Sequence, residues 1–286
     1  MNAEWGYAAR PDEVRERLRG GDYRAVLLTH NETSTAVMNP IADLAAAVRA
    51  EAPDALILVD SVSALGAVPF EMDAWGCDVV VTGSQKAWMA APGLAMVAAS
   101  DRAWAAMETA RMPRFYLDLR KHRDSSRGGE TPWTPAIAVV YQVDEGLRLM
   151  AAEGAENVFD RHETCADATQ AGLGALGFEL FADPPSRSKT VTAARIPDGL
   201  DWKAFNGEVK RRGVVLAGGQ GKLTGQVFRV GHLGSVTTDE ILGAIATLEA
   251  VSVSFGRAVQ VGAGVSAAQV ATIRAATGRA AARVGA

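Results

Sequence analysis

The stretch Thr82-Gly83-Ser84-Gln85-Lys86-Ala87-Trp88 separates two short apolar runs and limits how the chain can fold. The run before it, Cys77-Asp78-Val79-Val80-Val81, is β-branched and apolar, as in a buried strand. The run after it, Leu94 to Ala98, follows a Pro-Gly turn signal. Lysine is rarely buried without a partner. We therefore expect Lys86, at the end of a core strand, to pair with an acid or to take part in chemistry; a solvated loop is the ordinary alternative.

The composition indicates a globular chain and excludes several classes of protein. It has 286 residues, 48% of them hydrophobic, which is enough for one large domain or two modest ones. The 29 basic and 33 acidic residues give a net charge of −4, with no basic block to indicate a nucleic-acid partner. The chain has no apolar run of about 18 residues to span a membrane and no apolar signal core at its start.

The cysteines and histidines predict neither a disulfide framework nor a metal site. Only two cysteines occur, Cys77 and Cys165, and the four histidines are scattered without metal-type spacing. Such cysteine usage fits a reducing compartment. We therefore expect a cytoplasmic protein with no metal, no membrane and no nucleic-acid partner.

Alternating strands and helices in the first 100 residues predict an α/β fold. Ala25 to Thr29 is a buried-type strand, Asn39-Pro40 opens an amphipathic helix, and Ala55 to Val59 is the next buried strand. Near-continuous apolar strands of this kind form a mostly parallel sheet with helices on both faces.

Polar residues follow three of these strands. They are the cluster from His30 to Thr35, then Asp60, then Lys86. In parallel α/β sheets, ligands bind outside the carboxyl ends of the strands. The sequence therefore predicts a site at this edge.

The second half of the chain has a different order of predicted strands and helices. Residues 100–130 are rich in arginine and glycine and predict an irregular, solvated segment, and residues 135–154 predict a long interdomain helix. We expect residues 1–150 to form a large ligand-binding domain and residues 151–251 a smaller C-terminal α+β domain. Residues 252–286 are an Ala/Gly-rich tail, for which a weak helix and disorder are the two alternatives.

Asp60 and Lys86 together indicate one kind of chemistry. A lysine that forms an imine with a carbonyl compound must be available as the neutral amine. Pyridoxal phosphate uses such a lysine, together with a carboxylate that keeps its pyridine nitrogen protonated so that the ring can accept electrons. A direct ion pair between Asp60 and Lys86 is the alternative.

Five motifs in order carry a resemblance to a known family. The segments Val59-Asp60-Ser61-Val62-Ser63-Ala64-Leu65-Gly66 and Ser84-Gln85-Lys86-Ala87 resemble class V aminotransferases, which are fold-type I pyridoxal-phosphate enzymes. The alanine–glyoxylate and serine–glyoxylate branch is the most similar. Its His-x-Glu-[Ser/Thr]-Ser-Thr motif resembles His30 to Thr35. The remaining motifs are Thr131-Pro132-Trp133-Thr134-Pro135 and the C-terminal pair Gly218-Gly219-Gln220-Gly221 and Phe228-Arg229-Val230-Gly231-His232-Leu233-Gly234. The match spans roughly residues 5–250.

The resemblance implies roles for five residues around the cofactor. Lys86 matches the Schiff-base lysine, which also moves a proton, and Asp60 matches the partner of the pyridine nitrogen. Val62 matches the apolar residue against the ring face. Thr33 matches the hydroxyl that hydrogen-bonds the phenolic oxygen, and Gln85 matches a phosphate contact. For Asp60 and Thr33, capping of a local turn or helix is the ordinary alternative.

Three further residues imply a shared site and a substrate. Thr131 and Thr134 match residues that reach the phosphate of the neighbouring subunit, which implies an obligate homodimer; turn residues are the alternative. Arg229 matches the arginine that grips the substrate α-carboxylate, a task suited to a bidentate guanidinium. The alternative is that Arg229 is an arginine on the solvent-exposed face of a strand.

The implied activity is transamination from a small amino acid, of the alanine or serine type, to a 2-oxo acid such as glyoxylate. In the family about a hundred further residues come first, and they carry the glycine-rich loop and helix N-terminus that anchor the phosphate. We expect this chain to lack that N-terminal, phosphate-anchoring segment. A truncated or inactive fragment that acts as a binding or assembly partner is therefore one alternative. A cysteine desulfurase is another, but it needs a mobile reactive cysteine and usually a histidine where Gln85 precedes the lysine.

Overall fold

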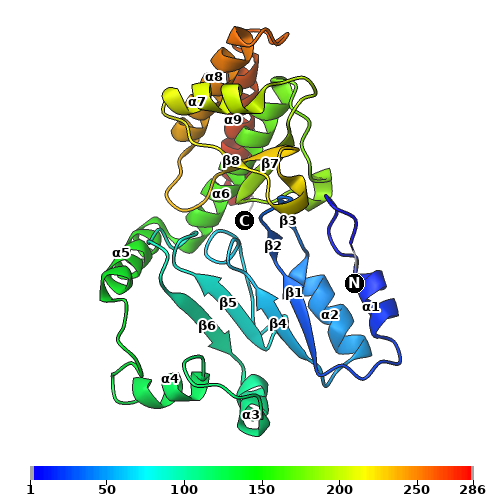
Figure 1. Ribbon diagram of the computed structural model, residues 1–286, viewed down its shortest axis with the longest axis vertical. Helices are drawn as coiled ribbons and strands as arrows, with labels where there is room; N and C mark the ends of the chain where they lie inside the picture. The colour runs from blue at the N-terminus through cyan, green and yellow to red at the C-terminus, as the bar shows by residue number, and fades with distance from the viewer. Residues whose placement is uncertain (1–2, 285–286) are drawn as a thin grey trace.

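Two β-sheets organise the computed structural model, which describes residues 3–284. Figure 1 shows a four-stranded sheet in the lower part and a three-stranded sheet with four helices in the upper part. Helix α5 (Ile137–Glu153) lies beside the lower sheet and leads into the upper part.

The lower sheet has the strand order β1-β4-β5-β6. Strands β1 (Ala25–Thr29), β4 (Leu56–Asp60) and β5 (Val79–Gly83) are parallel, and β6 (Ala95–Ala99) runs antiparallel to β5. The expected mostly parallel α/β sheet is therefore confirmed. Its register places Thr29 beside Asp60 and Asp60 beside Val81, so three strands end at the same edge.

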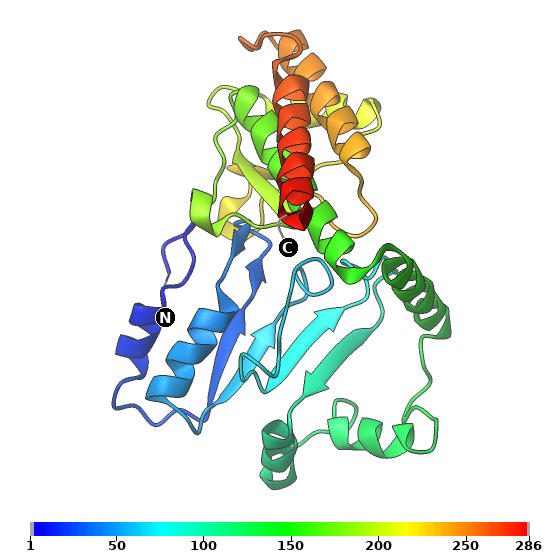
Figure 2. The same ribbon diagram turned by 180° about the vertical axis from the view of Figure 1, so that it is seen from behind.

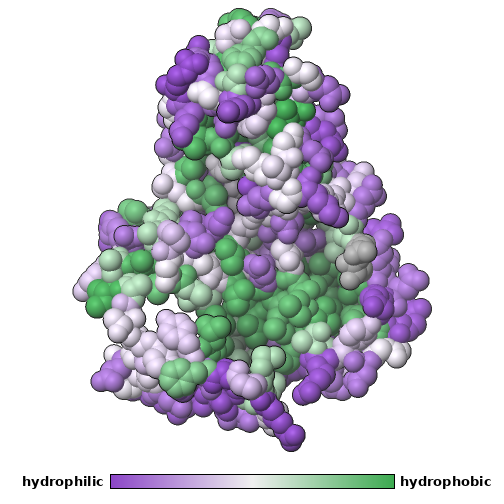
Figure 3. Space-filling model, in the orientation of Figure 1, coloured by the Kyte–Doolittle hydropathy of each residue, from purple (hydrophilic) through white to green (hydrophobic). Residues whose placement is uncertain are grey.

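Helices α1 (Pro11–Leu18) and α2 (Ile41–Glu51) cover one face of this sheet. Leu44 and Val48 of α2 belong to one buried cluster with Ile57, Val59 and Val80 of the strands. The alternate residues point to the other face, where Leu27 is 78% exposed. Figure 3 shows this face as a broad hydrophobic area over the lower sheet.

The segment expected to be irregular contains two helices, α3 (Asp101–Thr109) and α4 (Leu119–Ser126). That expectation was wrong because no apolar stripe marks them. Helix α4 has no buried residue, and helix α3 buries only Ala103. Side-chain caps start both helices: Ser100 accepts from the amide of Ala103, and Asp118 from that of Arg120.

A small hairpin connects the two parts of the molecule. Strands β2 (Asn31–Glu32) and β3 (Val37–Met38) pair antiparallel and rise from the end of β1 toward the upper sheet (Figure 1). Val37 forms an isolated antiparallel bridge with Arg187 of the upper part.

The upper part packs helices on a small antiparallel sheet. Its strands, in the order β7-β9-β8, are β7 (Val191–Arg195), β9 (Val227–Gly231) and β8 (Ala217–Gly218). Its helices are α6 (Ala155–Ala175), α7 (Trp202–Arg211), α8 (Thr238–Ser254) and α9 (Ala263–Val284), with short 3-10 turns at Pro184–Ser186 and Gly221–Leu223. Phe178, Phe205 and Phe228 form the aromatic centre of its core.

For the tail, the structure favours the helix over disorder. Helix α9 packs along α6 and α8 (Figure 2), and the buried carboxylate of Glu249 on α8 caps it. The Glu249 oxygens accept from the amides of Gly262 (2.5 Å) and Gly264 (2.8 Å). A Cβ at Gly264 would lie 2.7 Å from Leu176 Cδ2, so a larger residue there would force Leu176 to shift. No described helix combines the length and hydropathy needed to cross a bilayer.

We predict that Glu249→Ala lowers the free energy of unfolding by about 2 kcal/mol, because the buried amide of Gly264 and the partly buried amide of Gly262 lose a charged acceptor. Chemical denaturation measures the change, and Glu249→Gln, which keeps one acceptor oxygen, should lose less. The exposed Asp239 on the same helix provides a control as Asp239→Ala. A loss for Asp239→Ala as large as that for Glu249→Ala would contradict the capping role.

Candidate active site

One cavity of about 210 Å³ brings together three residues that are far apart in the sequence. Thr33, Lys86 and Arg229 all line it. They come from the hairpin after β1, from the turn after β5 and from β9 of the upper sheet. The cavity therefore lies at the boundary between the two parts, and its remaining lining is Ser63, Thr190, Val191, Ala217, Gln220, Gly231 and Leu233.

The turn that carries Lys86 is held by hydrogen bonds at both ends. Ser84 Oγ donates to the carbonyl of Ala91 (2.7 Å) and accepts from the amide of Leu94 (3.2 Å). Trp88 Nε1 donates to Thr82 Oγ1 (3.0 Å). The side chain of Lys86 is half-buried, and within residues 3–284 it makes no ion pair with an acid. Its amine is therefore available to a ligand in the cavity.

Helix α5 supports this turn from outside. Gln142 Oε1 accepts from the amide of Ala91 (2.7 Å), and Gly146 packs directly on the turn. A Cβ at Gly146 would lie 2.3 Å from the carbonyl oxygen of Trp88, so no other residue fits there. The expected interdomain helix thus also fixes the lysine turn.

Asp60 ends β4, and its carboxylate is exposed at the sheet edge. Oδ1 accepts from the amide of Val62 (3.0 Å), which orders the following loop. Asp60 has no ion pair with Lys86 among the described residues, so the direct-pair alternative is not what the structure has. Asp60 and Val62 lie beside the cavity without lining it.

Ser63 is a central contact that the sequence did not single out. Its hydroxyl accepts from Thr33 Oγ1 (2.9 Å) and Asn31 Nδ2 (2.9 Å) and donates to the carbonyl of Asn31 (3.0 Å). Buried Asn31 Oδ1 has no hydrogen-bond partner among the described residues. The serine is part of the Ser-Val-Ser segment after Asp60, yet only the fold shows that it fixes the hydroxyl of Thr33.

Arg229 is a buried cation held by neutral groups. It is 6% exposed; Nε donates to the carbonyl of Gly218 (2.9 Å) and Nη1 to that of Thr33 (3.1 Å). Burial lowers the pKa of Arg229, and the nearby charge of Glu32 opposes this shift. No carboxylate lies within ion-pair distance of its guanidinium in the described chain. Because a buried charge needs compensation, this guanidinium is suited to bind an anionic ligand.

The other predicted residues lie apart from the cavity. Gln85 is exposed, next to Lys86 but outside the lining. Thr131 lines a different cavity of about 370 Å³ beside α4, where its hydroxyl donates to the carbonyl of Trp133 (2.7 Å), and Thr134 is exposed. A single chain therefore does not bring Thr131 and Thr134 to Lys86, and their contact with a neighbouring subunit stays a prediction.

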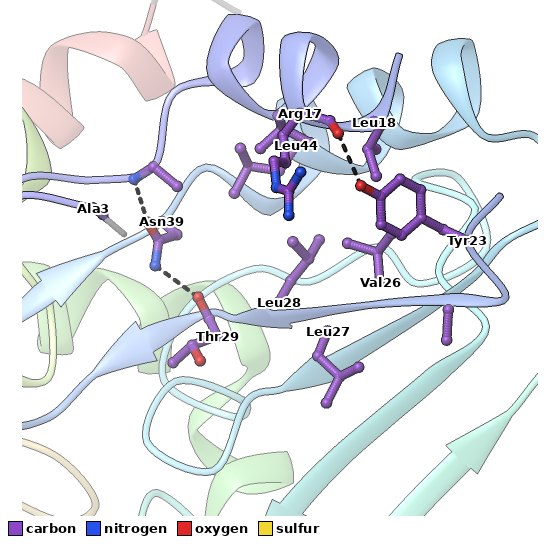
Figure 4. A pocket seen from close by; sticks show the side chains of 13 residues that line it. Ala3, Arg17, Leu18, Tyr23, Val26, Leu27, Leu28, Thr29, Asn39 and Leu44 are labelled. Atoms are coloured by element: carbon purple, nitrogen blue, oxygen red, sulfur yellow. Dashed lines mark hydrogen bonds between the residues drawn. The ribbon is translucent and has the colours of Figure 1, made fainter. Parts of the chain in front are cut away.

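A larger cavity of about 410 Å³ lies beside β1 and away from Lys86. Figure 4 shows Leu27 and Leu28 of β1, with Tyr23 and Arg17 above the strand. Its lining is mostly apolar and contains no acid, lysine or histidine. The cavity offers space at the sheet edge, and Tyr23 and Arg17 are the titratable side chains that line it among the described residues.

Neither cysteine has the properties of a nucleophile. Cys77 and Cys165 are free and buried, and burial raises the pKa of each thiol to about 11. A reactive cysteine is accessible and has a lowered pKa. The desulfurase alternative therefore lacks its thiol within residues 3–284.

Comparison with known proteins identifies the family. The family model for class V aminotransferases matches residues 2–239. The chain is 42% identical over 273 residues to "Soluble hydrogenase, small subunit" of Synechococcus sp. (strain PCC 6716), covering 94% of this chain and 71% of that protein. It is 40% identical over 274 residues to L-aspartate–glyoxylate aminotransferase of Paracoccus denitrificans (94% and 69%).

A solved structure agrees in fold. Pyridoxamine–pyruvate aminotransferase of Mesorhizobium loti aligns with a TM-score of 0.89 and 32% identity, covering 95% of this chain and 70% of the other. The chain belongs to the class V aminotransferase family, whose members depend on pyridoxal phosphate. The structure describes a lysine and a buried arginine that make no ion pair with any of the described residues, and a carboxylate at the adjacent strand end. These groups fit that cofactor and an amino acid.

We predict that acid destabilises the fold through its buried histidines. Burial lowers the pKa of His30 to about 4 and of His232 to about 3, and it also lowers the pKa of His162. The unfolded imidazole titrates near 6.5, so the unfolded chain binds more protons once the pH falls below that value. Stability is fully present above pH 6.5, and His30 and His232 each remove about 1.4 kcal/mol per pH unit below it, for His30 down to about pH 4.

Denaturation midpoints between pH 7 and pH 4 measure this slope. The variant His30→Asn should reduce the slope of stability against pH by about 1.4 kcal/mol per pH unit, which is the contribution of one bound proton. An unchanged slope in this variant would show that His30 titrates alike in both states.

Proposed function

We propose that the protein is an aminotransferase that moves an amino group from a small amino acid, of the alanine or serine type, to a 2-oxo acid such as glyoxylate. The observation that carries the proposal is the common cavity of Lys86, Thr33 and Arg229, in which the arginine has no acidic partner among the residues that the structure describes. The acceptor is proposed from the name of the Paracoccus relative, and the small volume supports a small donor.

Each residue has a proposed role. When bound, pyridoxal phosphate supplies an electron sink for the bond that breaks at the substrate α-carbon. Lys86 would hold the cofactor covalently until the substrate amino group displaces it, and the amine freed in this way would then accept and return the α-proton. Asp60 is the carboxylate for the pyridine nitrogen, Val62 packs on the ring, and Thr33 binds the phenolic oxygen. Gln85 is proposed as a phosphate contact.

Arg229 orients the substrate. Its guanidinium keeps donors free of acidic partners and binds the α-carboxylate, which places the α-carbon near Lys86. Because the arginine is buried between the two parts, water competes weakly for it and the charge-assisted bond is strong. Binding and orientation are thus supplied by the upper part, and proton transfer by the lower part.

We also propose a cytoplasmic homodimer and a domain boundary near residue 150. Phe115, Tyr116 and Leu117 before α4 and Ile137 and Tyr141 on α5 are exposed. An extended apolar surface of this kind marks an interface. Thr131 and Thr134 belong to the same region, which supports their proposed contribution to the phosphate site of a second copy. The two reduced cysteines support the compartment.

We predict that pyridoxal phosphate produces a new absorbance band at the edge of the visible range, and that an amino donor bleaches it. In Lys86→Ala the band should be lost because no other amine lines the cavity with Arg229. Absorbance titration measures both steps, with Lys189→Ala, at a lysine paired with Glu163, as the control. No band at saturating cofactor would refute the proposal for this chain and favour the alternative of an inactive binding partner.

We predict that Arg229→Ala raises the KM for the amino donor about 100-fold, because the α-carboxylate loses a charge-assisted bidentate partner. Affinity for pyridoxal phosphate should change by less than about threefold. Initial rates and cofactor titration give the two values. Arg195→Ala, which removes an exposed arginine of β7 paired with Glu179, is the matched control. Equal losses of donor and cofactor affinity would assign Arg229 a structural role instead.

A further inference from the structure

We propose that Thr190 is a positioning residue of the aminotransferase reaction: its hydroxyl ties the upper part to the loop after β4 and thereby sets the position of Arg229 relative to Lys86. Thr190 Oγ1 donates to the carbonyl of Ser63, 2.7 Å away, across the boundary between the two parts. Thr190 is 0% exposed, and both residues line the cavity. The inference rests on the proposed function.

The lower end of this contact is part of the proposed cofactor site. Ser63 follows Asp60 by three residues, and its own hydroxyl accepts from Thr33 Oγ1. The carbonyl that Thr190 binds and the hydroxyl that holds Thr33 therefore belong to one residue. Ser63 keeps its hydrogen bonds to Asn31 and Thr33 within the lower part, so loss of the Thr190 bond shifts the upper part and leaves the hydroxyl of Thr33 in place.

The upper end of the contact leads to Arg229 along the sheet. Thr190 directly precedes β7, and its carbonyl accepts from the amide of His232 (2.9 Å). One step further, Val191 pairs with Gly231, and Ala193 pairs with Arg229 itself. Antiparallel pairing is stiff over so short a span, so Thr190 and the backbone of Arg229 move together.

The hydrogen-bond directions around Thr190 are fully determined. Its single hydroxyl proton goes to the Ser63 carbonyl, so the 3.1 Å contact with Ser188 Oγ must be donated by Ser188. Ser188 Oγ in turn accepts from the amides of Thr190 (3.0 Å) and Val191 (3.2 Å). The amide of Ser188 crosses the boundary too, to the carbonyl of Ala36 (2.9 Å). We call Ser63, Ser188 and Thr190 the boundary clasp.

The boundary clasp also orders the second support of Arg229. Nη1 of Arg229 donates to the carbonyl of Thr33, which belongs to the lower part. That bond forms only while the two parts keep their register. Loss of the clasp therefore loosens Arg229 from Thr33, without removing either residue from the site.

Thr190→Val tests the proposal, because it keeps the shape of the side chain and removes the hydroxyl. We expect the KM for the amino donor to rise about tenfold, while kcat and the affinity for pyridoxal phosphate each change by less than about threefold. Thr190→Ser restores the donor and should return the KM to within about twofold of wild type.

Thr169→Val is the matched control. Thr169 is also a threonine with 0% exposure, and its hydroxyl also donates over 2.7 Å, but to the carbonyl of Cys165 within α6. This variant should lose stability to a similar degree and keep the wild-type KM. Equal effects of Thr169→Val and Thr190→Val on KM, or a parallel loss of cofactor affinity, would overturn the positioning role.

Equilibrium binding of propionate, a simple monocarboxylate, separates this inference from the proposed function. Propionate needs only the Arg229 subsite and no turnover, and nuclear magnetic resonance titration measures its affinity. Thr190→Val should weaken it about tenfold, and Thr169→Val should not. If wild type never turns over an amino acid, the proposed function fails while this comparison still decides on the clasp. Unchanged propionate affinity in Thr190→Val overturns the clasp alone.

Discussion

Parallel pairing of β1, β4 and β5 places three chain reversals side by side at one sheet edge. Each strand carries its polar residue just where it ends: the hairpin with Thr33 follows β1, Asp60 ends β4, and the Lys86 turn follows β5. Helix α2 and the apolar face beneath it fix the order of the strands, and the Gly146 contact of α5 fixes the lysine turn. The rest of the candidate site is built against this edge.

Electrostatics gives the upper part its function. A guanidinium that is 6% exposed and bound only to carbonyls keeps a positive charge in a place of low polarity. Burial without a counterion is costly, and an acidic side chain beside Arg229 would remove that cost together with the affinity for a ligand. The fold instead uses backbone carbonyls, which orient the guanidinium and leave its charge for a substrate carboxylate.

The boundary between the parts joins the two halves of the proposed chemistry. Thr33 takes part on both sides, since its hydroxyl contacts Ser63 and its carbonyl contacts Arg229. The boundary clasp lies next to it and is buried. Hydrogen bonds in such surroundings are electrostatically stronger than in water, and neighbouring ones strengthen each other. Donor binding is therefore expected to respond to changes at the boundary more than cofactor binding does.

The sequence by itself determined the mostly parallel α/β sheet, the family and the residues Lys86, Asp60, Thr33 and Arg229 as candidates. These features follow from local signals: apolar runs of strand length, polar residues at their ends, and short motifs. It missed α3 and α4, which bury almost nothing and so leave no periodic pattern. It also left the tail undecided, because α9 is fixed by contacts that local sequence does not show: the Glu249 cap, the close packing of Gly264 and the burial of Ala268 in the upper core.

Only the tertiary structure decided which of these residues meet. Thr33 and Arg229 are separated by 196 positions, and a carbonyl–guanidinium bond over that separation leaves no trace in local sequence. Ser63 and Thr190 are likewise joined by a hydrogen bond although they are far apart in the sequence, and serine and threonine are too common to mark such a contact. The single chain also separates Thr131 and Thr134 from Lys86, so a second copy is what their proposed role requires. Local patterns specify strands and motifs, whereas the site depends on contacts that form only when two distant parts of the chain pack together.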